Sequence, residues 1–145
     1  MEPSALSIAE MFRIERRADS PAEPDRGRVR AARFEIMVAE EVAGHIDLRL
    51  ETTEHLRLYG GHIGYFVAEA WRGHGLAAWA VRQVLPVARA EGLTELWITC
   101  NPDNHASRRT AEKAGAVFVE TIPLPPDNDM YLRGDREKSR FRLLL

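Results

Sequence analysis

The stretch AEAWRGHGLAAWAV, residues 68–81, decides how the rest of the sequence is interpreted. Its two glycines, Gly73 and Gly75, stand where a strand-like segment gives way to a helical one, and they leave the space around the turn free of side chains. A helix start preceded by glycines presents unpaired backbone N–H groups and the positive end of the helix dipole. We therefore expect this turn to bind a pyrophosphate, with Arg72 adding a charge-assisted contact.

The composition favours a compact domain and argues against several classes of protein. With 145 residues, 45% hydrophobic and 29% charged, the chain can bury a core, so we expect one domain over residues 1–145. A net charge of −2 provides no positive field for nucleic acid. The apolar runs are too short to span a bilayer, and the start of the chain does not resemble a secretory signal. These features indicate a cytoplasmic protein that binds neither nucleic acid nor membranes. The single cysteine, Cys100, cannot form an internal disulfide or a metal cluster.

Alternating apolar and polar residues predict strands before the glycine turn. The first strand covers residues 11–17, and an exposed loop with mixed charge and two prolines follows over residues 18–30. Two further strands, over residues 34–38 and 42–50, are predicted to form a hairpin. In the second of these strands, one face is expected to carry Val42, Gly44, Ile46, Leu48 and Leu50.

Around the glycine turn the pattern predicts a strand, a helix and a second strand. The strand over residues 62–70 is apolar on both faces at its centre, as in the middle of a sheet. The helix ends at Gly92, and Pro86 inside it removes one hydrogen bond and should bend or loosen it. The strand over residues 93–100 is expected to run parallel to the strand before the helix, because such a unit forms a right-handed crossover.

The last part of the chain is predicted to add a helix and two strands. The helix begins near Asp103 or Asn104, either of which can cap it, and stops at Gly115. Strands follow over residues 116–122 and 139–145, and the apolar residues of the last strand need cover from the domain or from a second subunit. Together these elements predict an α/β (α+β) fold: a mixed, mostly antiparallel central sheet with one parallel β-α-β unit and flanking helices.

Two other kinds of phosphate-binding turn compete for the glycine-rich stretch. A nucleoside-triphosphatase loop needs a Gly-Lys-Ser/Thr ending, which GHGLAA lacks. A dinucleotide turn, G-x-G-x-x-A, is matched by Gly73, Gly75 and Ala78, but its usual context is the first β-α-β unit of a long parallel sheet. Here antiparallel strands come first and too little chain follows, so a dinucleotide binder is the weakest hypothesis.

Two blocks of sequence resemble the GCN5-related N-acetyltransferase (GNAT) superfamily, and the resemblance extends over residues 11–145. The acetyl-CoA turn of that family is written R/Q-x-x-G-x-G/A, and RGHGLA supplies it after a strand that ends in a valine. A second block, DNHASRRTAEKAGAVF, follows in the family's order. The branch that modifies protein N-termini, with its uncharacterised bacterial relatives, is the most similar. The matching residues are Val67, Arg72, Gly75, Ala77, Asn104, Ser107, Glu112, Lys113 and Gly115.

This resemblance implies an acetyl-CoA-dependent N-acetyltransferase that acts on a primary amine of a small molecule or peptide, and it implies no metal. Backbone amides from His74 to Ala77 would hold the pyrophosphate, while the main chain of Val67 and the side chain of Asn104 would bind the pantetheine arm. The alternative from another functional class is a non-catalytic acyl-CoA sensor that keeps the turn. The implied cofactor-binding residues are Val67, Arg72, Gly73, His74, Gly75, Leu76, Ala77, Asn104 and Ser107.

The catalytic residues are less clearly indicated than the cofactor turn. The family's base commonly lies on the strand before the turn, which here falls close to His62, and an ordinary histidine pKa of about 6.5 suits proton removal near neutral pH. The alternative is that His62 only hydrogen-bonds the loop before the strand. Many relatives carry a tyrosine that protonates the thiolate, and this chain has Ala111 there. The remaining proton donors are Ser107, Tyr131, water or the substrate ammonium.

The region between the first two strands departs from the family. Members usually place two helices there, which wall the acceptor site, whereas this chain offers only the loop over residues 18–33. The N-terminal helix pair is therefore expected to be shortened or missing. The acceptor pocket would then be open, or completed by a second subunit in a homodimer.

Overall fold

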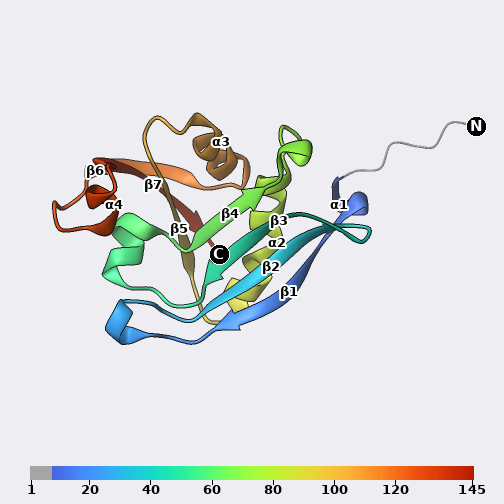
Figure 1. The fold of residues 1–145 in the computed structure, drawn as a ribbon, viewed down its shortest axis with the longest axis horizontal. Helices are drawn as coiled ribbons and strands as arrows, with labels where there is room; N and C mark the ends of the chain where they lie inside the picture. Colours follow the sequence, from blue (N-terminus) through green and yellow to red (C-terminus); the bar gives the residue numbers. More distant parts are fainter. Residues whose placement is uncertain (1–7) are drawn as a thin grey trace, which may run out of the picture.

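The computed structural model describes residues 8–145, which form two antiparallel sheets with helices around them (Figure 1). The first sheet has the order β1-β2-β3-β4 and the second β5-β7-β6. The strands are β1 Phe12–Ser20, β2 Ala31–Val38, β3 Glu41–Arg49, β4 Ile63–Val67, β5 Glu95–Cys100, β6 Val117–Pro123 and β7 Glu137–Leu144. The α-helices are α1 Ile8–Met11, α2 Leu76–Ala90, α3 His105–Lys113 and α4 Asp129–Leu132, and the short turns are η1 Pro24–Arg26, η2 Leu56–Gly60 and η3 Glu69–Trp71.

This architecture confirms the predicted mixed fold with mostly antiparallel strands and flanking helices, but β4 and β5 differ from the predicted parallel pair. They belong to different sheets. One backbone hydrogen bond, from the N–H of His62 to the carbonyl of Trp97 at 2.7 Å, joins the chain just before β4 to the middle of β5. Beyond that bond β4 pairs only with β3. The free edge of β4 therefore faces the space in which a ligand can lie.

The prediction that residues 62–70 form a mid-sheet strand is wrong, because β4 is the edge strand of the first sheet. Phe66 on its outer face is 48% exposed. Partial cover for that face comes from side chains: His45 stacks on Phe66 with ring centroids 5.8 Å apart, and Arg72 lies over the same ring. The apolar residues on both faces of this strand therefore reflect side chains that cover each face. They do not show that the strand has a neighbour at both edges.

The predicted hairpin between β2 and β3 is confirmed, with one correction to its inward face. The pairing shifts so that Ile36 faces Gly44 while Met37 faces Val42, which leaves Ala43 as the extra residue of a β-bulge. The bulge turns Ala43 into the core, where it is 0% exposed, and turns Val42 out to 52% exposure. Simple alternation could not show this shift, because one extra residue reverses the facing of everything on one side of it.

Between β1 and β2, the described chain contains only the three-residue turn η1, so the shortened helix region expected from the sequence is confirmed. Strand β1 is longer than the alternation indicated and continues to Ser20, which pairs with Ala31. A register shift between Arg16 and Ala18 interrupts the alternation and hid this extension. The exposed loop is correspondingly shorter than predicted.

The main core lies between the first sheet and α2, which runs behind that sheet in Figure 1. Helix α2 continues through Pro86 to Ala90. Its apolar residues recur at helical spacing and meet the inward residues of β2 and β3, as the sequence predicted. The fully buried side chains at this contact include Ile36, Ile46, Leu48, Val81, Val84 and Ala88.

The second sheet buries the C-terminal strand from within the domain. Strand β7 is central, and its Phe141 and Leu143 are 0% and 5% exposed. The edge strand β6 exposes Val117, Phe118 and Val119. The homodimer considered from the sequence stays a prediction. In residues 8–145, no helix is long and apolar enough to cross a membrane, and no cluster of side chains suited to a metal ion is found.

Candidate active site

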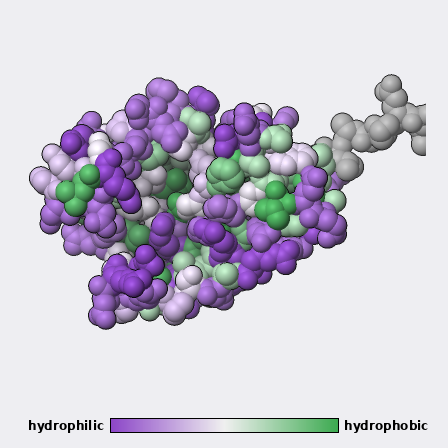
Figure 2. Space-filling view, in the orientation of Figure 1, coloured by the Kyte–Doolittle hydropathy of each residue, from purple (hydrophilic) through white to green (hydrophobic). Residues whose placement is uncertain are grey.

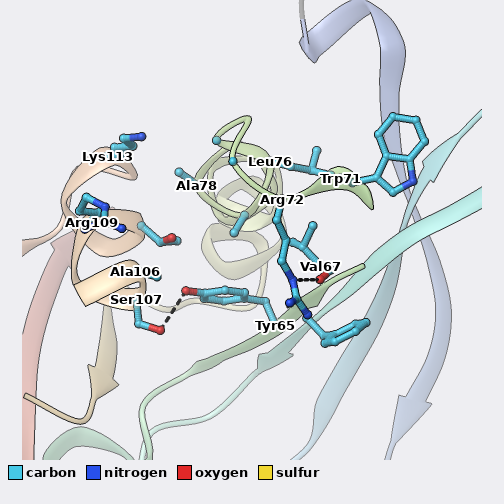
Figure 3. Close-up of a pocket in the computed structure, with 15 residues that line it drawn as sticks. Tyr65, Val67, Trp71, Arg72, Leu76, Ala78, Ala106, Ser107, Arg109 and Lys113 are labelled. Atoms are coloured by element: carbon cyan, nitrogen blue, oxygen red, sulfur yellow. Dashed lines mark hydrogen bonds between the residues drawn. The ribbon is translucent and has the colours of Figure 1, made fainter. Parts of the chain in front are cut away.

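A pocket of about 500 Å³ lies where the end of β4, the glycine turn and the start of α2 face α3 (Figure 3). It unites most of the predicted cofactor residues with others that the sequence did not single out. Its lining consists of Tyr65, Phe66, Val67, Trp71, Arg72, Gly73, Gly75, Leu76, Ala77, Ala78, Ala106, Ser107, Arg109, Thr110 and Lys113.

The glycine turn leaves its backbone open, as expected from the sequence, and the structure adds its conformation. Gly73 and Gly75 both adopt left-handed conformations, with φ of 83° and 74°, which other residues rarely tolerate. A Cβ atom added at either glycine would meet no atom within 4 Å, so the turn is open to a ligand. Within residues 8–145, no backbone N–H from Gly73 to Ala78 donates to a protein acceptor. The turn therefore offers a row of free donors at the positive end of α2.

Among the described residues, three cations and no carboxylate line this pocket, which gives it a positive field. Arg72 comes from the turn, while Arg109 and Lys113 come from one face of α3 (Figure 3). The sequence analysis did not assign Arg109 or Lys113 to the cofactor. Their spacing, four residues apart in the helix that also presents Ser107, is the signal that could have identified them.

Arg72 holds the end of β4 as well as lining the pocket. Its Nε donates to the carbonyl oxygen of Val67 at 2.7 Å, and its guanidinium lies 5.5 Å from the ring centroid of Phe66. The carbonyl of Val67 therefore already has a donor. The prediction that the main chain of Val67 pairs with pantetheine stays a prediction; the Val67 N–H, or the second lone pair of its carbonyl oxygen, would make that contact.

A pair of hydroxyl groups crosses the pocket from β4 to α3. The Tyr65 hydroxyl donates to Ser107 Oγ at 3.2 Å (Figure 3). Because Ser107 Oγ accepts this bond, its own hydrogen is free to donate to a third group. Ser107 was predicted to lie here and Tyr65 was not. Tyr65 stands two residues before Val67 and so on the same face of the strand, which is the signal that could have found it.

Two predicted cofactor residues do not line the pocket, namely His74 and Asn104. His74 is exposed in the turn. Asn104 caps α3, because its Oδ1 accepts a hydrogen bond from the backbone N–H of Ser107 at 3.1 Å. The cap positions Ser107 in the first turn of α3.

His62, the predicted base, lies outside the pocket in the protein interior, where it is 0% exposed. Its Nδ1 accepts from the backbone N–H of Trp97 at 2.9 Å, so the neutral ring carries its hydrogen on Nε2, which is 2.8 Å from the Thr52 hydroxyl. Burial, and to a lesser extent the charge of Arg49, lower the pKa of His62 to about 4. This geometry does not support a base role, and it matches the alternative that His62 holds the preceding loop.

Tyr131, the other predicted proton donor, is not brought near Ser107. It lies on α4, where its ring packs against the guanidinium of Arg136 at 3.9 Å. Helix α4 borders a different hollow of the molecule, lined in part by Asp129 and Arg133. The proline-rich segment before α4 carries this helix away from the glycine turn, and nothing in its local sequence indicated where it would fold.

Comparison with known proteins gives a family-level match. The model of the acetyltransferase (GNAT) domain family matches residues 6–117. No curated protein matches in sequence.

Solved structures with the same fold are longer acetyltransferases. The microcin C7 self-immunity acetyltransferase MccE, solved with acetyl-CoA and AMP, has 16% identity and a TM-score of 0.62 over 79% of this chain and 61% of its own. An acetyltransferase from Salmonella typhimurium that modifies the N-terminal serine of ribosomal protein L7/L12 has 22% identity and a TM-score of 0.62 over 83% and 66%. RimJ from Mycobacterium smegmatis, solved with CoA-disulfide, has 23% identity and a TM-score of 0.61 over 83% and 55%. The chain thus spans less than two thirds of each of these proteins.

Proposed function

We propose that this chain, which belongs to the GNAT acetyltransferase family, transfers the acetyl group of acetyl-CoA to a primary amine of a small molecule or peptide. The amine would attack directly while both substrates are bound. The observation that carries this proposal is the pocket at the start of α2, where free backbone donors and three cations face one cavity without a carboxylate.

The residues of this pocket fit the chemical parts of coenzyme A. The N–H groups of the glycine turn and the side chains of Arg109 and Lys113 suit phosphate groups, because the donors are preorganised and the charges are opposite. The open space over Gly73 and Gly75 lets a pyrophosphate approach the backbone. A volume of about 500 Å³ also falls within the range of ordinary small-molecule sites.

The two hydroxyl groups can manage the proton of the leaving group. Acetyl-CoA, when bound, supplies an acetyl thioester that an amine can attack. Ser107 can give its hydroxyl hydrogen to a thiolate, and Tyr65 can replace that hydrogen through the bond that it already donates to Ser107 Oγ. The proton lost by the amine balances the proton gained by sulfur, and solvent returns it to Tyr65.

In the part of the chain that the structure describes, the pocket lining contains no histidine, carboxylate or cysteine to serve as a general base. The amine would therefore arrive neutral or lose its proton to water, and catalysis would depend mainly on orientation. The same observation favours a second candidate, a non-catalytic acyl-CoA-binding module. Release of free thiol from acetyl-CoA with a panel of amines separates the two, because the binding module gives tight binding without turnover on any amine.

The substitution Gly75→Glu tests the cofactor site. It places a side chain and a negative charge at the turn, and we expect CoA binding measured by calorimetry to weaken at least about 100-fold. Gly92→Glu is the matched control: Gly92 has a φ of 89° and the same open surroundings, but it follows the opposite end of α2. This control should bind CoA like the wild type.

The calorimetric experiment includes NAD as a second ligand. Tight binding of CoA and none of NAD supports the proposal, while the opposite result would revive the dinucleotide hypothesis. If Gly75→Glu and Gly92→Glu bind CoA equally well, the cofactor does not use the glycine turn, and the proposal falls.

A further inference from the structure

A second hollow, of about 850 Å³, shares no lining residue with the cofactor pocket and is called the acceptor groove below. It is formed by the turn between β1 and β2, the outer face of β2 and β3, η2 and α4. Figure 1 shows η1, η2 and α4 at the same end of the molecule, and Figure 2 shows that this end is mostly hydrophilic. The charged residues that line the groove are Glu23, Arg28, Arg33, Asp47, Arg49, Asp129 and Arg133.

Most of this charge is compensated within the protein. The lining holds four arginines and three carboxylates. Arg33 donates two hydrogen bonds to Asp47, at 2.7 and 2.8 Å, and this pairing uses both oxygens of that carboxylate. Arg28 lies 3.8 Å from Glu23 at the rim of the groove. The groove thus keeps an excess of about one positive charge.

Arg49 is half-buried, whereas the other groove arginines, Arg28, Arg33 and Arg133, are exposed; Arg133 likewise forms no ion pair within residues 8–145. Arg49 comes from the end of β3, and one of its terminal nitrogens donates to the carbonyl of Gly61 at 3.1 Å. It forms no ion pair within residues 8–145. Burial lowers the pKa of Arg49, and the charge of Asp47 opposes this effect. Both oxygens of Asp47 already accept hydrogen bonds from Arg33. A half-buried guanidinium without a carboxylate partner is costly to keep, and an anion in the groove would offset that cost.

The groove comes near the strand that carries the hydroxyl pair. Asp47, in the groove, faces Gly64 across the β3–β4 ladder, and a Cβ atom at Gly64 would meet nothing within 4 Å. The next residue, Tyr65, lines the cofactor pocket. One strand residue therefore separates the partner of Asp47 from the hydroxyl pair.

We infer that the acceptor groove binds a small amine that also carries a carboxylate, with Arg49 as the anchor of the carboxylate. The fork of an arginine matches the two oxygens of a carboxylate. The net excess of about one positive charge suits one negative charge, whereas a phosphate monoester would bring nearly two. That this molecule is the acetyl acceptor rests on the proposed function, but its binding does not.

The binding test uses a matched pair of probes, glycylglycine and glycylglycinamide, which share the amine and differ in the carboxylate. Each is titrated into the isotope-labelled full chain, and the backbone N–H signals of Gly60, Gly61 and Asp129 are followed by NMR together with the Nε–H signal of Arg49. We expect saturable shifts with glycylglycine and an affinity about tenfold lower for glycylglycinamide. Equal affinities for the two probes, or no shifts at these positions, would overturn the inference.

Three variants test whether Arg49 causes the preference for glycylglycine over glycylglycinamide. Arg49→Gln should remove the preference for glycylglycine, and Arg49→Lys should restore part of it because the charge returns without the fork. Arg82→Gln, at an exposed position on α2 outside both hollows, is the control and should keep the wild-type preference. A preference that survives in a folded Arg49→Gln protein contradicts the inference. If that variant does not fold, the comparison of the two probes on the wild type decides.

A kinetic arm separates this inference from the proposed function. Turnover with acetyl-CoA that is equal for both probes would reject the groove assignment and leave the acetyltransferase proposal intact. If the wild-type chain does not bind CoA in calorimetry but still shows the glycylglycine shifts, the acetyltransferase proposal is rejected and the groove assignment stays intact.

Discussion

The cofactor pocket and the acceptor groove are built in opposite ways. The cofactor pocket depends on one short stretch, in which two glycines and the first turn of α2 present unpaired donors, and all its charged side chains are positive. The acceptor groove is assembled from four separate parts of the chain, and most of its charges are paired with one another. A site of the first kind can be identified from local sequence. A site of the second kind exists only after the chain has folded.

The largest expected effect concerns His62, which is a buried structural residue outside both hollows. Replacement of His62 by Gln should cost about 2 kcal/mol of unfolding free energy at pH 7, because two buried hydrogen bonds are altered. The folded pKa of about 4 lies below the ordinary 6.5, so the unfolded chain binds a proton that the folded chain does not. The contribution of His62 is therefore complete above pH 6.5 and falls by about 3 kcal/mol as the pH drops to 4.

Urea unfolding of the wild type and of His62→Gln between pH 4 and 7 measures this difference, since contributions of other groups cancel. The variant should lack the pH-dependent loss that His62 causes. A pH–rate profile should keep its shape in the variant. If the pH–rate profile of the variant instead loses its limb near neutral pH while the stability is unchanged, His62 is the base. The assignment of His62 as a structural residue is then wrong.

The hydroxyl pair is expected to affect turnover rather than binding. Ser107→Ala should lower kcat about 100-fold and Tyr65→Phe about tenfold, with little change in the KM for acetyl-CoA. Thr110→Val, which removes a third hydroxyl from the same pocket lining, should leave kcat near the wild-type value. Steady-state thiol release measures all three. A rise in KM at constant kcat in Ser107→Ala would show that the serine only binds the cofactor.

The smallest effect should come from the cap of α3. Asn104→Ala should lower the stability by about 1 kcal/mol and the Tm by about 3 °C, because the N–H of Ser107 loses its acceptor. Asn104→Asp keeps the accepting oxygen and should restore the stability. If the side-chain amide of Asn104 also binds the pantetheine arm, as the family resemblance implies, CoA affinity measured by calorimetry should fall in both variants. Unchanged affinity would leave Asn104 with the cap alone.

Sequence reasoning succeeded where the chemistry is carried by neighbouring residues. The left-handed turn at Gly75 and the start of α3 at Asn104 both follow from interactions within a few residues. It failed where a partner comes from elsewhere in the chain. The environment of His62 depends on Trp97, which is 35 residues away in the sequence. The inward turn of Ala43 depends on the register between two strands.

By itself the sequence predicted a phosphate-binding turn at residues 72–77, and it determined the order of the main strands and helices and the family resemblance. Hydrophobic periodicity and the conformational freedom of glycine are local properties of a chain. They can be read without knowing which distant residues will pack against the segment. Only the tertiary structure decided that β4 and β5 separate after one hydrogen bond, that His62 is buried, and that Arg49 stands unpaired in a groove. Burial and the pairing of charges depend on which distant segments meet, and one sequence does not contain those distances.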